Sequence, residues 1–177
     1  MEFPSRKEYN DYFSNYIKLL PQANPVYLLE QTYSYQKDLI KRLEPFIYDY
    51  RYDLDKWTVK ELLIHLMDCE QILAYRALRF ARNDFSDPLL FDEDNYVSSA
   101  NASSFDWDAL LKQLDLTRRL SIQLFKNFDA STTLKGGSKN FPLTVRAIAA
   151  TISGHGLHHL YVLQERYLKI DVKRFSL

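Results

Sequence analysis

The chain has 177 residues, with 23 basic and 23 acidic side chains and a formal net charge of zero. This length is typical of a single domain, which we expect to span residues 1–177. The balanced charge argues against nucleic-acid binding, which normally needs an excess of Lys and Arg. No apolar run approaches the roughly 18 residues of a membrane span. With one cysteine, Cys69, and no signal-peptide pattern, we expect a cytoplasmic protein.

The first predicted helix runs from about Arg6 to Leu20. Ser5 and Glu8 have the spacing of a capping box, which opens a helix, and Pro21 ends it. Its apolar side is a narrow aromatic face that must be covered, either by the bundle of the same chain or by a second copy. That face consists of Tyr9, Tyr12, Phe13, Tyr16, Ile17 and Leu20. We expect this accessory helix, within residues 1–20, to pack on the rest of the same chain.

Four longer amphipathic helices follow. Only 4 glycines and 6 prolines interrupt the chain, which favours long helices over strands. Pro25 takes the favoured first position of the second helix, and Thr58 with Glu61 forms another capping box. The sequence predicts long helices over about 24–44, 58–81, 106–128 and 145–168, and a helical turn near 92–97. This pattern predicts an all-α four-helix bundle with its core within residues 25–168.

The four histidines are the most informative residues. His65 lies in the third predicted helix, and His155, His158 and His159 lie in the last one. Residues four apart share a helix face, so His155 and His159 can hold one ion together. These two and His65 fall on the apolar stripes of their helices, where an unpaired polar group costs roughly 1–3 kcal/mol. A divalent metal ion would satisfy all three and leave a fourth position open, as in catalytic zinc sites.

Two neighbours of these histidines have alternative roles. His158 could replace a ligand, or form a hydrogen bond between helices from the flank. Cys69, one turn after His65, could be a soft metal ligand or a small core residue.

Other residues could support chemistry at the same centre. Gly154 and Gly156 could allow close helix packing or leave room for a ligand. Glu61 could contact an imidazole in addition to its capping role, and Trp57 could wall a pocket. Arg166 could bind a carboxylate or extend to the surface. An acidic run could cover the mouth as a lid or base, or be a solvated surface; it comprises Asp92, Glu93 and Asp94.

Two motifs resemble the signatures of the DinB-like superfamily, which includes the YfiT proteins. Residues 57–66, WTVKELLIHL, resemble its Trp-Ser/Thr-x-x-Glu-hydrophobic-x-x-His signature. Residues 155–159, HGLHH, resemble the His-Gly-x-His-His form of its second signature. The resemblance covers about Pro25 to Tyr167. Many members carry Gln or His three residues after the second His ligand, whereas this chain has Val162.

The resemblance implies an up-down-down-up four-helix bundle with one divalent ion, nickel or zinc, held by His65, His155 and His159. Better-understood relatives transfer low-molecular-weight thiols such as bacillithiol or mycothiol, and others are called metal-dependent hydrolases. For this chain we expect a metal-dependent enzyme of the thiol-transfer type that acts on a small molecule. Gly156 and Arg166 are candidate contacts for the thiol, and Glu61 and Trp57 are candidate supports for catalysis.

Two alternatives to thiol transfer stay open. One is metal-dependent hydrolysis, which is weakened because no Glu stands between the paired histidines as it does in His-Glu-x-x-His. The other is a non-catalytic helical module that binds a partner. In all three cases we expect a homodimer that does not bind nucleic acid or membranes.

Overall fold

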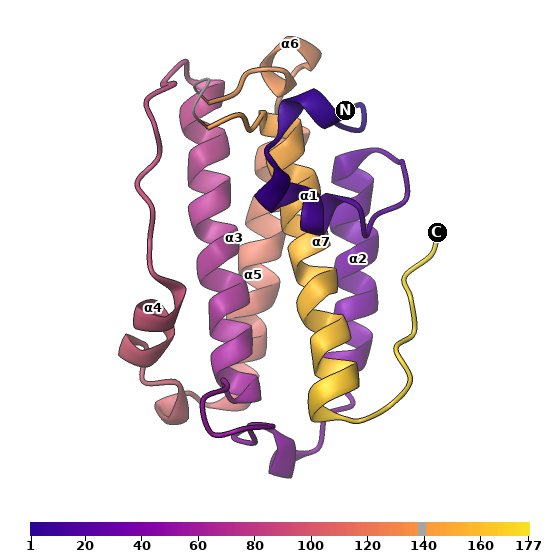
Figure 1. Cartoon of the computed structure of the whole chain (residues 1–177), viewed down its shortest axis with the longest axis vertical. Coiled ribbons are helices and arrows are strands. Elements are labelled where there is room, and N and C mark those ends of the chain that lie inside the picture. Colours follow the sequence, from indigo (N-terminus) through magenta and orange to yellow (C-terminus); the bar gives the residue numbers. More distant parts are fainter. Residues whose placement is uncertain (138–140) are drawn as a thin grey trace.

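The structure, a computed structural model, describes residues 1–137 and 141–177. Four long helices form a bundle (Figure 1), as the sequence predicts. They are α2 (Pro25–Ile40), α3 (Val59–Ala81), α5 (Trp107–Lys126) and α7 (Val145–Val162), and a π-helical turn, Leu163–Tyr167, extends α7. The described residues form no strand beyond two isolated bridges. Nor does any helix in the described part of the chain have the length and apolar character needed to cross a membrane.

The bundle has the up-down-down-up topology that the family resemblance implies. In Figure 1, α2 and α7 run in one direction along the bundle, and α3 and α5 run in the other. Helix α7 packs against α2 and α3, and α5 packs against the same two helices. Because α3 and α5 are parallel, the chain between them must return along the length of the bundle. This crossover contains the short helix α4 (Glu93–Ser99), close to the predicted helical turn.

Local sequence signals start these helices where they were predicted. Thr58 Oγ1 accepts a hydrogen bond from the Glu61 amide, and Glu61 Oε2 accepts one from the Thr58 amide, which completes the capping box of α3. Asp106 and Thr144 cap α5 and α7 through their side-chain oxygens. The four-residue helix α6 (Ala130–Thr133) was not predicted, because one turn is too short to show a periodic pattern.

The N-terminal helix is shorter than predicted. Instead of one helix over 6–20, a 3-10 turn (Arg6–Glu8) precedes helix α1 (Asp11–Ile17), which Asn10 caps. Between them Tyr9 is extended and bridges to Leu143. The reason lies in Glu8, whose backbone carbonyl and carboxylate both accept hydrogen bonds from Thr144 and so hold the segment at the start of α7.

Helix α1 packs on α7 of the same chain, as expected for its aromatic face. The contact is close because Gly154 has no side chain. A Cβ atom at this position would lie 2.3 Å from the carbonyl oxygen of Tyr16. The short N-terminal helix is therefore an integral part of the packed structure.

The apolar core has two parts that meet near the middle of the bundle. One contains Phe13, Leu28, Leu73, Phe80 and Ile148, and the other contains Tyr33, Leu62, Met67, Leu110 and Leu163. Buried polar side chains stand where the two parts meet. Glu70 lies between Met67 and Leu73 on α3, and the histidines predicted as ligands lie on the neighbouring turns of α3 and α7.

Candidate metal centre

Three imidazoles converge in the bundle interior. The Nε2 atom of His155 lies 3.2 Å from Nε2 of His65 and 3.0 Å from Nε2 of His159. The ring centroids of His65 and His159 are 4.8 Å apart. Helix α3 supplies the first ring and one face of α7 supplies the other two. The arrangement therefore brings together the three histidines that the sequence singled out as ligands.

The environment keeps these imidazoles neutral. Burial lowers the pKa of His65 to about 4. Burial and then the neighbouring imidazoles hold the pKa values of His155 and His159 well below the usual range. Neutral imidazoles present the lone pairs that bind metal ions.

The geometry of this cluster fits a divalent ion. A neutral imidazole carries one N–H, so the two short contacts at His155 Nε2 make a poor hydrogen-bond network. Among the described residues, Nδ1 of His159 is the one buried side-chain nitrogen or oxygen atom that lacks a hydrogen-bond partner. Two imidazole nitrogens about 2.1 Å from one tetrahedral zinc ion lie roughly 3.4 Å apart. The observed separations of 3.2 and 3.0 Å are close to this value.

Cys69 offers an alternative third ligand. Its Sγ atom lies 3.6 Å from Nδ1 of His65, and the potential ligand atoms of His65, Cys69 and His155 all lie within 4.8 Å of one another. This group could therefore hold a metal ion as well. Burial raises the pKa of the Cys69 thiol to about 12, so the thiol is protonated when no ion is nearby. The two possible ligand sets share His65 and His155 and differ in His159 or Cys69.

Trp57 forms a wall of the centre. Its ring centroid is 4.5 Å from that of His65, and its Nε1 donates a hydrogen bond of 3.1 Å to Asp94 Oδ1 in α4. The acidic run thus has several roles, because Asp92 caps α4 and Glu93 lines the cavity described below.

His158 and Glu61 lie beside the centre rather than in it. His158 is exposed on the flank of α7, and its ring centroid is 4.9 Å from that of His159. The Glu61 carboxylate caps α3 and lies 3.7 Å from Arg51, so it serves the end of the helix and not an imidazole.

For Gly156 and Arg166 the structure agrees with the alternative to ligand binding, which is close helix packing for the glycine and an exposed side chain for the arginine. A Cβ atom on Gly156 would contact the Gln36 side chain at 3.3 Å, so α2 occupies the space expected for a ligand. The hollow that Gly156 lines has about 10 Å³, room for about one water molecule. Arg166 lies in the π-helical turn with its side chain exposed, and its Nη2 is 3.5 Å from a carboxylate oxygen of Glu165. Helix packing explains the glycine, and Arg166 extends to the surface.

A cavity of about 350 Å³ opens on the imidazoles. This volume lies within the usual range for small-molecule sites. Its walls come from α1, α3, α7 and the crossover, and include Tyr12, Phe13, Tyr16, Cys69, Leu73, Arg76, Leu90, Phe91, Glu93 and Phe141. Sequence reasoning missed Arg76 and the α1 residues as parts of the site. The helical spacing of His65, Cys69, Leu73 and Arg76 along one face of α3 could have indicated Arg76.

A second hollow of about 310 Å³ lies on another side of His159. Its lining is more polar and includes Asp55, Lys56, Asp94 and Tyr167. Trp57, His158 and His159 border both hollows, so the imidazole cluster is reached from two sides.

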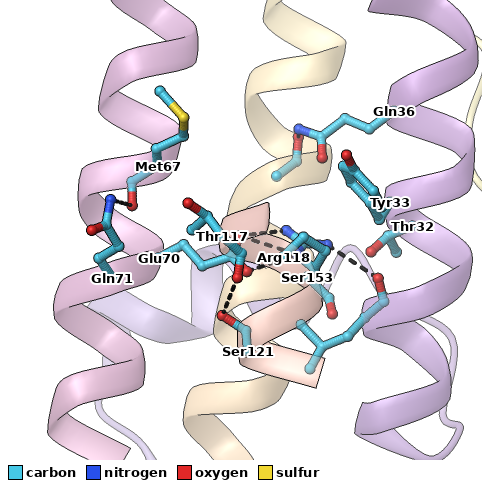
Figure 2. Close-up of polar contacts among 12 residues, drawn as sticks. Thr32, Tyr33, Gln36, Met67, Glu70, Gln71, Thr117, Arg118, Ser121 and Ser153 are labelled. Carbon is cyan, nitrogen blue, oxygen red and sulfur yellow. Dashed lines mark hydrogen bonds and ion pairs between the residues drawn. The ribbon is translucent and has the colours of Figure 1, made fainter. Parts of the chain in front are cut away.

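A second buried polar cluster stands next to the centre (Figure 2). The Arg118 guanidinium donates to Glu70 Oε1 at 2.8 Å and to Oε2 at 2.9 Å, and its Nη1 donates to the carbonyl of Leu29 at 3.1 Å. Glu70 and Arg118 are each 4% exposed. Gln36 Nε2 donates to the carbonyl of Gly156 at 3.3 Å. These bonds connect all four long helices and hold the backbone beside His155.

The fold and the centre define a helical-bundle protein with a buried histidine cluster at a ligand-sized cavity. The sequence profile of the DinB superfamily matches residues 28–163, and the chain belongs to this superfamily. No curated protein matches the sequence.

Among solved structures, the chain is similar to YfiT from Bacillus subtilis, with a TM-score of 0.71 over 96% of this chain and 95% of that chain. That structure is described as a probable metal-dependent hydrolase with an unusual four-helix bundle topology. The two sequences are 15% identical, so this likeness shows the fold alone.

Proposed function

We propose that the chain is a metal-dependent enzyme that holds one divalent ion, zinc or nickel, through His65, His155 and His159. The observation that carries the proposal is that three neutral imidazoles converge where a cavity of about 350 Å³ begins. Three neutral ligands retain the full charge of an ion and leave a position for a small molecule.

The chemistry proposed is activation of a small thiol, such as bacillithiol, for transfer to an electrophilic substrate. A bound ion lowers the pKa of a thiol or water that it coordinates. The rings of Tyr16 and Trp57 pack against those of His155 and His65, respectively, and help to hold the imidazoles in place beside the cavity. A thiolate needs no further base to attack, which suits a centre where no described carboxylate contacts an imidazole.

Hydrolysis is the second candidate. The description of YfiT as a probable metal-dependent hydrolase favours it. Glu93 is the one carboxylate among the described residues that line the main cavity, and it is the candidate general base. Glu93→Gln should therefore abolish hydrolysis and leave thiol transfer unaffected.

Metal analysis followed by two activity screens tests these proposals. The zinc-loaded chain is supplied with low-molecular-weight thiols and electrophilic acceptors, and separately with activated esters and amides. Turnover above that of His159→Ala in the first screen supports thiol transfer, and in the second it supports hydrolysis. Stoichiometric metal without turnover in either screen would instead support a binding module.

The proposed assembly is a cytoplasmic homodimer that forms through the bundle. Leu116 and Leu120 on α5 are 56% and 71% exposed and offer an apolar contact surface. Light scattering on the full chain measures the oligomeric state, and Leu120→Lys should produce monomers if this surface is used.

A further inference from the structure

Arg76 lies in the same cavity as the imidazole cluster but far from it along α3. It comes eleven residues after His65, and Cys69 and Leu73 line the cavity between them. Because an α-helix rises about 1.5 Å per residue, Arg76 is roughly 16 Å from His65 along the helix axis. The cavity therefore connects the imidazole cluster to a cationic side chain.

The Arg76 guanidinium is buried without a counterion. The residue is 6% exposed, and no carboxylate among the described residues lies within ion-pair distance of it. One of its five N–H donors is used, in a hydrogen bond of 2.7 Å from Nη2 to the carbonyl of Leu89. Burial accordingly lowers its pKa. Its guanidinium carbon also lies 5.6 Å from the centroid of the Phe141 ring, a cation–π contact that does not neutralise the charge. A buried charge without a counterion is strongly unfavourable, so an anion that enters the cavity would be stabilised there.

Other arginines in this fold have the carboxylate that Arg76 lacks. Arg118 is equally buried and binds Glu70 through two nitrogens, and Arg146 binds Glu8. Arg79, one turn after Arg76, binds Asp84 at 2.7 Å. Glu93, the one acidic residue among the described lining residues, is exposed and forms no ion pair with Arg76.

We propose that Arg76 binds a carboxylate on the small molecule whose other end reaches the imidazole cluster. The planar guanidinium matches a carboxylate through two parallel hydrogen bonds. Between the two ends the walls are apolar and aromatic, with Leu73, Phe13 and Phe91. The ligand class is thus an elongated acid with an apolar body. The claim about its reactive end rests on the proposed function, whereas the claim about its carboxylate does not.

A purely structural role accounts for Arg76 less well. Its one hydrogen bond, to the carbonyl of Leu89, could anchor the crossover to α3. That hydrogen bond needs one neutral donor, and the cation–π contact with Phe141 leaves four N–H donors of the charged group unused by the described residues. The crossover is also anchored by Arg79, through Asp84 and the Ser86 carbonyl.

The test compares matched acid and neutral probes on the full chain by calorimetry. Decanoate and 1-decanol probe the cavity without zinc, and 11-mercaptoundecanoate and 1-undecanethiol probe the zinc-loaded chain. We expect the acid of each pair to bind about 10- to 100-fold more tightly, as for hydrogen bonds to charged groups. Arg76→Met should remove this preference and leave binding of the neutral probes unchanged.

Arg79→Met is the matched control, because it weakens the crossover without altering the cavity, and it should keep the preference. Equal binding of acid and neutral probes by the wild-type chain would overturn the proposal, even if Arg76→Met does not fold. A preference that survives in folded Arg76→Met would also overturn it. If zinc does not bind but decanoate preference depends on Arg76, the proposed function fails and this inference stands. If zinc and thiols bind with no preference for the acid, this inference fails and the proposed metal site stands.

Discussion

Two buried polar clusters lie side by side in this bundle and differ in how well their groups are satisfied. The Glu70–Arg118 cluster is complete, since the guanidinium meets both carboxylate oxygens and the Leu29 carbonyl. In the imidazole cluster, ring nitrogens crowd together, and Nδ1 of His159 has no partner among the described residues. The complete cluster needs no further partner, whereas crowded ring nitrogens beside a cavity are available to bind a ligand.

The largest expected effect comes from breaking the complete cluster. Glu70→Gln leaves the Arg118 charge buried without a counterion, and the free energy of unfolding should fall by about 3–5 kcal/mol. Urea denaturation measures the loss. The double variant Glu70→Leu with Arg118→Met should recover most of it, because two apolar side chains replace the pair. If Glu70→Gln lowers the free energy of unfolding by less than about 1 kcal/mol, the buried pair contributes no more than a surface salt bridge, and the prediction is wrong.

The incomplete cluster should gain stability only when metal is added. At a free zinc concentration 1,000 times the dissociation constant, the folded state gains about 4 kcal/mol. His159→Ala should lose this gain together with stoichiometric zinc, as measured by melting with and without a chelator. His158→Ala is the matched control, because its ring lies on the flank of α7, and it should retain most of both. Equal losses in the two variants would show that the ligand assignment is wrong.

A third cluster holds the N-terminal segment and should respond to pH. Burial opposes ionisation of Glu8, but hydrogen bonds from Arg146, Ser5 and Thr144 outweigh it and hold its pKa at about 2. This pKa is lower than the unfolded value near 4.5, so the stabilisation is complete above pH 4.5 and declines as the pH falls toward 2. Glu8→Gln should cost about 1–3 kcal/mol at pH 7. The difference between the variant and the wild type should shrink in acid, and a constant difference would contradict this explanation.

The smallest expected effect is that of Cys69→Ser. If His159 is the third ligand, the serine hydroxyl can replace the thiol beside His65, and zinc stoichiometry should not change. The affinity for zinc should change by less than about tenfold, which is the smallest loss typical when a residue that contacts a metal ligand is removed. Cobalt-loaded wild-type chain without added thiol should then show no sulfur-to-cobalt absorption band. Such a band, lost in Cys69→Ser, would assign the ligand set of His65, Cys69 and His155 instead.

The sequence predicts the bundle well because its signals are local. Capping residues such as Thr58 and apolar stripes at helical spacing determine the long helices, and the one-turn spacing of His155 and His159 places both rings on one face. That His65 meets them follows from the same stripes, since only one interior is available to helices of this length.

Features that depend on contacts between distant segments could not be predicted from these local signals. The break between the Arg6–Glu8 turn and α1 follows from the contacts of Glu8 with Thr144 and Arg146, more than 130 residues away. The sequence left the role of Gly156 open between helix packing and space for a ligand, because its neighbour Gln36 comes from another helix. Helical spacing alone could have placed Arg76 on the same face of α3 as His65, but its lack of a counterion is visible only in three dimensions.

The position of α1 has a consequence for comparisons among relatives. Tyr12, Phe13 and Tyr16 wall the cavity, yet they precede residue 28, where the match to the superfamily begins. The histidines and this part of the cavity wall therefore lie in parts of the chain that can diverge independently. Two relatives with identical histidine motifs can accept different molecules if their N-terminal segments differ. Exchanging residues 1–20 between such relatives should change which molecules the cavity accepts, provided that the close contact of α1 with Gly154 is kept.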